Sequence, residues 1–207
     1  MAVLIYLEHW EGKFKKLSFE LVSYASKIAE MIGSQSIALT IGTVDEQELE
    51  KLALHGADKV IHIENQKLDT LDEQAFTNLV SDVARNYNAT VLVLSNNNSG
   101  KALAPRLSVQ LKAGLVSGVS KLPVSISPFV VYKKVYSGKA YVNMRIKTDI
   151  KILTLAQNSF EIIQDPKPFV VEHLNIQPND NLLNTKVKEV HNLTGKVLLT
   201  DADIVVS

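Results

Sequence analysis

The sequence predicts an α/β protein with a doubly wound, mostly parallel sheet that antiparallel strands extend. Over residues 1–94, short apolar runs alternate with amphipathic helical stripes. The fourth of these runs is apolar at nearly every position, which is typical of a central parallel strand covered on both faces. From Val119 onward the helical stripes give way to β-rich runs. Alternating strands and helices favour parallel strands joined by right-handed crossovers.

The first strand and helix open the chain. Ala2–Leu7 is an apolar run typical of a buried strand. Ser18 is the predicted N-cap of the following helix, and Gly33 is the residue expected to end it. The buried face of this helix is a stripe at spacings of three and four, formed by Leu17, Leu21, Ala25, Ile28 and Ile32.

The second strand–helix unit leads to a third strand. Ser36–Ile41 is the predicted second strand, and Lys59–Ile63 is the third. Between them, Thr43 and Glu46 have the spacing of a capping box. Gly56 suits a left-handed residue at the helix end.

The third helix has the clearest amphipathic stripe in the chain, between Phe76 and Tyr87. Thr70 and Glu73 form a second possible capping box before it. Thr90–Leu94 is the predicted fourth strand. These elements complete a β-α-β-α-β-α-β order.

A fourth helix is expected from near Gly100 to about Lys112, with Gly114 closing it. Pro105 is tolerated in a first turn but costs about 3 kcal/mol in a helix interior. We therefore expect an irregular first turn.

The β-rich part contains three strands that we expect to extend the sheet in antiparallel fashion. They are Phe129–Tyr136, Lys139–Ile146 and Ile150–Leu155. Ser137-Gly138 is a hairpin signal between the first two. Phe169–Leu174 is one more candidate strand.

Residues 1–174 are thus expected to form an N-terminal α/β domain. Residues 175–207 are polar and rich in Asn, with Pro178 and Gly195, and this composition indicates a linker or arm. The arm ends in the apolar run Ala202–Ser207. We expect this run to be a strand that leads into a further domain.

Composition excludes several classes of function. Lys+Arg and Asp+Glu both number 22, and a formal net charge of +0 argues against a nucleic-acid surface. Zero Cys excludes disulfides, thiol catalysis and cysteine-ligated iron–sulfur clusters. No apolar run reaches the ~18 residues of a membrane span. Met1–Leu7 lacks the basic region of a signal peptide, so a cytoplasmic protein is the expectation.

The loop Ser95–Lys101 is the best candidate for a ligand site. It follows the fourth strand and opens a helix, where free N–H groups and the helix dipole favour a phosphate or carboxylate. Ser99, Gly100 and Lys101 are the candidate binding residues, with Lys101 adding positive charge. The loop lacks the glycine density of the phosphate-binding fingerprints, so a structural or interface loop is the alternative.

Three side chains are candidates for a partner interface. Arg106 suits pairing with a carboxylate across an interface. Trp10, the only Trp, lies beside a strand end and is either an interface anchor or part of the core. Tyr136 lies at the predicted hairpin turn.

No catalytic set emerges from the sequence. The histidines show no metal-ligand spacing, so each is expected to be a surface or hydrogen-bonded histidine, and no metal site is predicted. Glu8 and His9 end the first strand, but such a pair alone is weak support for acid–base chemistry. No G-x-S-x-G elbow is present. The pattern favours a binding or assembly module over an enzyme.

Seven segments carry a family resemblance: Tyr6–Lys13, Ser18–Ala29, His55–Val60, Ser99–Leu107, Leu111–Val119, Val135–Ala140 and Ala202–Ser207. They span nearly the whole chain. On them, the sequence resembles the N-terminal domain of the alpha subunit of electron transfer flavoprotein, with the chain stopping just before the FAD-binding domain.

The resemblance implies an adenine nucleotide alpha-hydrolase-like fold and an electron carrier subunit. It implies FAD in the complete protein, held mainly by the C-terminal domain and not expected in this chain alone. It implies a beta subunit partner that holds AMP, with flavin dehydrogenases as donors and a quinone reductase or another protein as acceptor. Gly118 departs from the acidic residue common in the family. The alternative is a free-standing adenine-nucleotide-binding module of similar fold.

Overall fold

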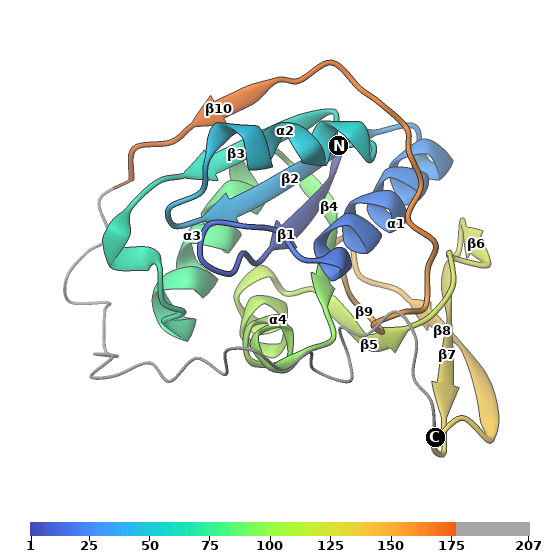
Figure 1. The fold of residues 1–207 in the computed structure, drawn as a ribbon. Coiled ribbons are helices and arrows are strands. Elements are labelled where there is room, and N and C mark those ends of the chain that lie inside the picture. Colours follow the sequence, from blue (N-terminus) through green and yellow to red (C-terminus); the bar gives the residue numbers. More distant parts are fainter. Residues whose placement is uncertain (177–207) are drawn as a thin grey trace, which may run out of the picture.

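Strands and helices alternate through the first part of the chain, as the sequence predicts (Figure 1). The structure is a computed structural model that describes residues 1–176. The helices are α1 (Lys16–Ile32), α2 (Glu46–Leu54), α3 (Glu73–Asn86) and α4 (Asn98–Leu111), with a 3-10 helix η1 at Gln66–Leu68. The strands are β1 (Ala2–Leu7), β2 (Gln35–Ile41), β3 (Lys59–Ile63), β4 (Ala89–Ser95), β5 (Gly114–Val119), β6 (Ser125–Ile126), β7 (Phe129–Val135), β8 (Ala140–Ile146), β9 (Lys151–Leu155) and β10 (Val171–His173). The predicted arm at 175–207 lies almost wholly outside the described residues.

Within residues 1–176, one mixed sheet joins the ten strands in the order β10-β3-β2-β1-β4-β9-β5-β7-β6, and β8 pairs with β7. The strands from β10 to β5 are mutually parallel. The chain winds outward from β1 through β2 and β3, then crosses back to β4 on the other side of β1. This reversal between β1 and β4 is the point at which open α/β sheets bind ligands, outside the carboxyl ends of the strands.

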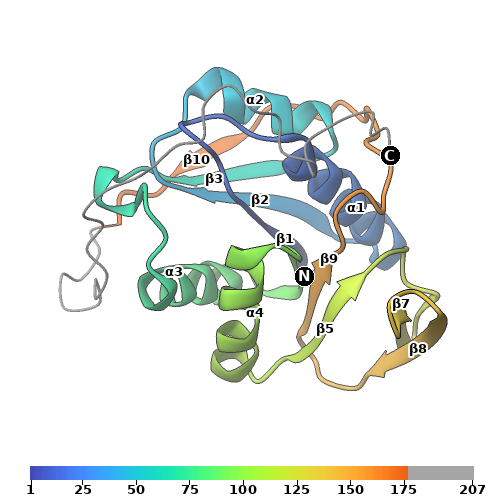
Figure 2. The same ribbon diagram turned by 60° about the horizontal axis from the view of Figure 1, so that its bottom comes forward.

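The helices cover the sheet on both faces, which explains the apolar character of the central strands (Figure 2). On one face, α1 and α2 pack residues such as Leu21 and Leu49 against the sheet. On the other face, α3 and α4 contribute Phe76 and Leu103. Every residue of β1 is buried, since a strand between two helical layers has no solvent face. The predicted doubly wound α/β fold is confirmed.

The β-rich part differs from the prediction in the pairing of β9 and in the additional strands β5 and β6. β7 and β8 form the predicted antiparallel hairpin. The run at 150–155 does not extend the sheet in antiparallel fashion, because β9 lies between β4 and β5 and is parallel to both. β5 was not predicted. Lys112, with φ 52°, ends α4, and Gly114 instead opens β5. A Cβ atom on Gly114 would lie 2.6 Å from Ile146 Cγ2, so this close approach requires glycine.

The helix caps lie close to their predicted positions but on other side chains. Ser18 lies inside α1, whose N-cap is Lys15. Asp45 and Asp72 are the N-caps of α2 and α3, each two residues after the threonine that the capping-box spacing indicates. The Asp72 carboxylate accepts two first-turn N–H groups of α3, at 3.0 and 3.1 Å. When several Ser, Thr and Asp residues precede a helix, spacing alone does not choose among them.

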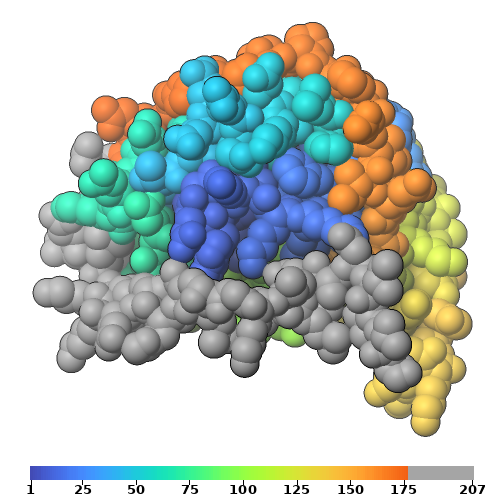
Figure 3. All heavy atoms as spheres, viewed as in Figure 1, coloured from blue at the N-terminus to red at the C-terminus, as the bar shows by residue number. Residues whose placement is uncertain are grey.

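A long segment after β9, here called the strap (residues 156–170), runs over α1 and α2 to reach β10 at the far edge of the sheet. It is the orange band on the outer surface in Figure 3. Its beginning is held by Glu20 of α1, which is 2% exposed. The Glu20 carboxylate accepts the N–H groups of Asn158, Ser159 and Phe160 at 3.1, 2.7 and 2.9 Å. Three N–H donors compensate for the burial of this carboxylate.

Candidate functional site

A hollow of about 580 Å³ lies at the carboxyl ends of β1 and β2 and is here called the carboxyl-end cleft. Aromatic side chains of Tyr6, Trp10 and Phe76 line it, and Ser99 of α4 reaches its edge. This position at the winding reversal is where the fold predicts a ligand. The volume lies within the range of small-molecule sites.

The charge of the cleft is acidic. Its lining includes the carboxylates of Glu8, Glu11, Asp45 and Asp69, and no Lys or Arg among the described residues lines it. Acidic side chains also affect their neighbours: burial, and secondarily the charge of Glu8, raises the pKa of Tyr6 well above its ordinary value. Such a lining repels phosphate and favours a neutral or cationic group.

Glu8 connects two segments of the chain beside the cleft. Its Oε1 atom accepts hydrogen bonds from Ser95 Oγ at 2.8 Å and from Asn97 Nδ2 at 3.0 Å, joining the end of β1 to the β4–α4 connection. Asn97 Oδ1 in turn accepts the N–H of Gly100 at 2.9 Å as the N-cap of α4. The Gly100 N–H, which the sequence suggests as a donor to a bound anion, therefore already donates to Asn97.

The three predicted ligand residues do not converge. Ser99 lines the cleft, whereas Lys101 is exposed and is not part of its lining. Gly100 is buried, and a Cβ atom there would lie 1.8 Å from the carbonyl oxygen of Ser95. Gly100 therefore permits the tight β4–α4 connection. Its binding role, like that of the other two residues, stays a prediction.

The three predicted interface residues lie on separate surfaces. Trp10 is 51% exposed beside the cleft, with Lys15 Nζ 5.2 Å from its ring centroid, so it is not a core residue. Tyr136 is 81% exposed at the tip of the β7–β8 hairpin. Arg106 is exposed on α4 and donates from Nη1 to the Ala102 carbonyl at 2.8 Å.

The hydrogen bond of Arg106 lies in the turn of α4 that contains Pro105. α4 begins at Asn98, two residues before the predicted start near Gly100, so Pro105 lies in its interior. A proline in a helix interior removes one backbone donor and displaces the preceding carbonyls. The Arg106 side chain supplies a donor to the preceding turn.

The β7–β8 hairpin projects from the body of the protein (Figure 1). Directly opposed residues of an antiparallel pair share a face. One face consists of Phe129, Val131, Lys133 and Val135 of β7 with Ala140, Val142, Met144 and Ile146 of β8, and is here called the hairpin apolar face. Its base is buried in the core, but Val142 and Met144 are 37% and 38% exposed. An apolar surface therefore continues from the core out to the solvent.

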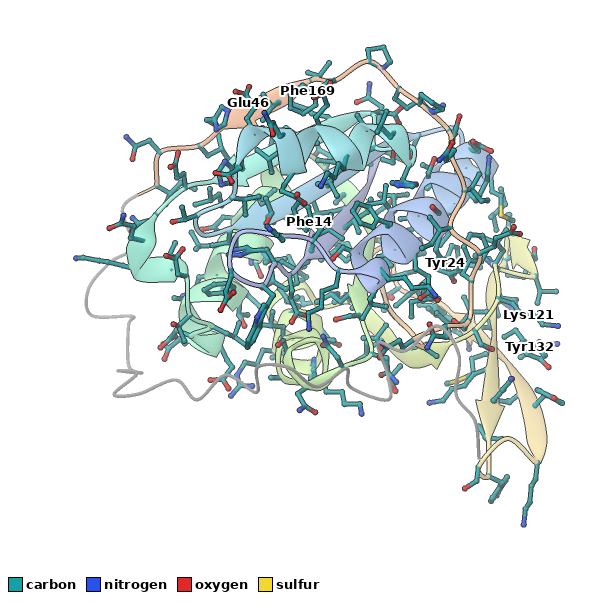
Figure 4. The ribbon with its side chains drawn as sticks, in the orientation of Figure 1. Phe14, Tyr24, Glu46, Lys121, Tyr132 and Phe169 are labelled. Carbon is teal, nitrogen blue, oxygen red and sulfur yellow. The ribbon has the colours of Figure 1, made fainter. Side chains whose placement is uncertain are left out.

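Contacts at the base of the hairpin fix its direction (Figure 4). The buried Tyr24 of α1 donates its hydroxyl to the Lys121 carbonyl at 3.0 Å. The Lys121 ammonium lies 4.9 Å from the ring centroid of Tyr132 on β7, within cation–π distance. Tyr132 stacks on Tyr141 with centroids 5.1 Å apart. The hairpin is a positioned element of the fold.

A cluster that the sequence did not predict lies at the other edge of the sheet. β10 pairs with β3 so that His173 stands opposite His62, with ring centroids 5.3 Å apart. His62 is buried and hydrogen-bonded through Nε2 to the Gly42 carbonyl, as expected of a hydrogen-bonded histidine, but its Nδ1 atom has no hydrogen-bond partner among the described residues. Burial holds the pKa of His62 below its ordinary value. Only the pairing of strands far apart in sequence creates this cluster, so no spacing could have indicated it.

The fold defines a class of protein: a doubly wound α/β domain with an open carboxyl-end cleft and a projecting hairpin. Among the described residues, no helix has the length and apolar character to cross a membrane.

Comparison with known proteins gives the family. The sequence matches the electron transfer flavoprotein domain over residues 3–180, and the chain belongs to this family. Protein FixB of Clostridium saccharobutylicum is 24% identical over 100% of this chain and 63% of that protein. The electron transfer flavoprotein subunit alpha of Bacillus subtilis is 26% identical over 99% of this chain and 63% of that protein. The predicted resemblance to the N-terminal domain of the alpha subunit is confirmed.

Relatives also include subunits with other names. Lactate dehydrogenase (NAD(+),ferredoxin) subunit LctC of Acetobacterium woodii is 27% identical over 56% of this chain and 28% of that protein. The chain spans about 63% of the length of the alpha subunit and FixB relatives that it matches from end to end. Electron transfer flavoprotein subunits are electron carriers, and this role is supported for the family to which the chain belongs.

Proposed function

We propose that this chain is the assembly domain of an electron transfer flavoprotein alpha subunit, and that it binds a beta subunit through the hairpin apolar face. The complex would carry electrons from flavin dehydrogenases to a quinone reductase or another acceptor, in the cytoplasm, without being an enzyme itself. The observation that carries the proposal is the uncovered apolar strip at Val142 and Met144, continuous with the core. Uncovered apolar strips of this kind mark protein interaction sites.

The lining of the carboxyl-end cleft does not suit FAD. The carboxyl-end cleft carries the carboxylates of Glu8, Glu11, Asp45 and Asp69, which repel a pyrophosphate. The proposal therefore assigns FAD to the complete protein outside the described residues, and AMP to the beta subunit. When bound, the flavin would supply the electron-transfer chemistry. The chain's own residues would supply only the surface that holds the subunits together.

Hairpin variants test the assembly. Val142→Asp and Met144→Asp place a charge on the hairpin apolar face, whereas Asn143→Asp places the same charge on the opposite face of the same strand. Each variant is co-expressed with a beta subunit of an electron transfer flavoprotein, and the dissociation constant is measured by calorimetry. We expect the first two to weaken binding at least tenfold, or about 1.4 kcal/mol, and the control to leave it unchanged.

Circular dichroism spectra that match the wild type would show that the variants remain folded. Unchanged affinity in both Val142→Asp and Met144→Asp would overturn the assignment of this surface. Equal losses in all three variants would mean that the charge alone, and not the apolar face, controls binding.

The alternative function, a free-standing adenine-nucleotide-binding module, rests on the position and volume of the carboxyl-end cleft. The acidic lining argues against it, because a nucleotide phosphate needs positive charge or free N–H donors.

A further inference from the structure

A cluster of metal-binding side chains occupies the outer edge of the sheet, far from the hairpin. His62 and Glu64 come from the end of β3, and His173 comes from β10. One ligand atom of each of the three residues lies within 4.8 Å of the other two. The cluster depends on the strap, because the strap carries β10 across the molecule to β3 (Figure 1).

The hydrogen bond of the His62 ring leaves its other ring nitrogen available to a metal ion. Its Nε2 atom lies 2.8 Å from the Gly42 carbonyl oxygen, and only a protonated Nε2 can donate to that oxygen. Nδ1 then carries the lone pair. His62 is only 1% exposed, and its buried Nδ1 atom has no hydrogen-bond partner among the described residues. Histidines that bind metals commonly donate their other ring N–H to a carbonyl or carboxylate in this way.

We propose that His62 Nδ1, the His173 imidazole and the Glu64 carboxylate bind a divalent transition metal ion of the zinc class. Two imidazoles and one carboxylate suit Zn²⁺, whereas Mg²⁺ and Ca²⁺ prefer oxygen ligands throughout. Glu64 and His173 are exposed, so the ion reaches the site from solvent. Three protein ligands leave a fourth position for water.

The bound ion would fasten the end of the strap to the sheet. β10 is a short edge strand that pairs only with β3 among the described strands. Lys59 of β3 already forms an ion pair with Glu172 of β10. A metal ligand from each strand adds a second link, so metal binding should stabilise the native state by mass action.

The test uses the full chain without a polyhistidine tag, stripped with chelator. Zn²⁺ binding is measured by calorimetry, and Co²⁺ serves as the spectroscopic probe because its visible absorption reports imidazole and carboxylate ligands. We expect one ion per chain with a micromolar or tighter dissociation constant. Zn²⁺ should also raise the melting temperature.

Exposed ligands are replaced first, since changing the buried His62 could impair folding. Glu64→Gln and His173→Ala should each weaken Zn²⁺ binding at least tenfold and abolish the rise in melting temperature. Glu50→Gln is the control matched to Glu64→Gln, because Glu50 is an exposed carboxylate of α2 and is not part of the cluster. Affinity no tighter than millimolar in the wild type, or unchanged affinity in His173→Ala, would overturn the proposal.

Discussion

Gly100 has the least room for a side chain among the described glycines. A Cβ atom there would meet the Ser95 carbonyl oxygen at 1.8 Å, in the connection that Glu8 and Asn97 hold closed. At an unhindered helix position, Gly→Ala would raise the free energy of unfolding by about 1 kcal/mol. At Gly100 the overlap with the Ser95 backbone makes the same substitution destabilising. We expect Gly100→Ala to lose about 3 kcal/mol of unfolding free energy, or to prevent folding.

Gly138 gives the control for that measurement by urea unfolding. It has φ +84° at the hairpin turn, and a Cβ atom there meets nothing within 4 Å. Gly138→Ala should lower the free energy of unfolding by about 1 kcal/mol, because of backbone strain alone. If the two variants lost equal stability, the close packing of Gly100 would not be the cause of its loss.

Glu48 contributes a pH-dependent link between α2 and the loop before α1. The hydrogen bond from Lys51, assisted by the Phe14 N–H, holds the pKa of Glu48 below its ordinary value. A carboxyl group whose pKa is lowered by folding stabilises above its unfolded pKa. That stability disappears as pH falls through the lowered folded pKa.

We therefore expect Glu48→Gln to lose up to about 1 kcal/mol at pH 7, because the pair is partly exposed, and to lose progressively less as pH falls below 4.5. Urea midpoints measured across this range give the comparison, with Glu50→Gln on the exposed side of α2 as control. If the stability difference between Glu48→Gln and the wild type did not change with pH, the charge of Glu48 would not be the cause of that difference.

Single residues were the least predictable part of the sequence. Gly33 was correctly expected to end α1, because a left-handed residue after a helix favours glycine. The N-caps of the first three helices were not, since several nearby residues satisfy the same local rule. The orientation of His62 depends on Gly42 and β10, and local sequence carries neither contact.

At the scale of elements, the strap depends on one buried carboxylate. Glu20 accepts three backbone N–H groups where the strap leaves the sheet. Glu20→Gln keeps the shape but replaces an acceptor oxygen with an NH₂ donor that faces N–H groups. Leaving buried donors unsatisfied costs about 1–3 kcal/mol, which is the loss of stability that we expect.

Hydrogen exchange would locate the effect of Glu20→Gln. The N–H groups of Asn158, Ser159 and Phe160 should exchange faster, while those of β4 change only by the global loss of stability. Glu30→Gln, the same change at an exposed carboxylate of the same helix in an i,i+3 ion pair with Lys27, is the control and should leave the strap unchanged. Protection that persists at all three positions would contradict the role of Glu20.

Strand position was harder to predict than strand existence. The runs that became β1 to β4 have the buried apolar pattern of parallel strands, and their alternation with helices determines their order. β9 follows a hairpin, which suggested an antiparallel neighbour, yet it returns between β4 and β5. Its pattern, apolar on both faces, fits either place, so the choice is made by the tertiary pairing.

For the whole molecule, the sequence was enough to predict the layers and the family but not the surfaces. The alternation of elements is present in the structure, and the family model matches residues 3–180. The exposed strip at Val142 and Met144 results from a hairpin that projects beyond the sheet, and periodicity alone does not show which end of a strand is covered. The charge of the carboxyl-end cleft likewise depends on loops that come together only in the fold.

The acidic charge of the carboxyl-end cleft should weaken the binding of AMP. The cleft has the position and volume of a nucleotide site, but Glu8, Glu11, Asp45 and Asp69 line it and the Gly100 N–H is used by Asn97. Exposed Lys101 supplies little attraction through solvent. We expect a dissociation constant for AMP no tighter than about 1 mM, or ~4 kcal/mol. Adenosine, which lacks the phosphate, should bind at least as well in calorimetric titration. Micromolar affinity for AMP that Lys101→Ala abolishes would instead favour the nucleotide-binding module over the assembly domain.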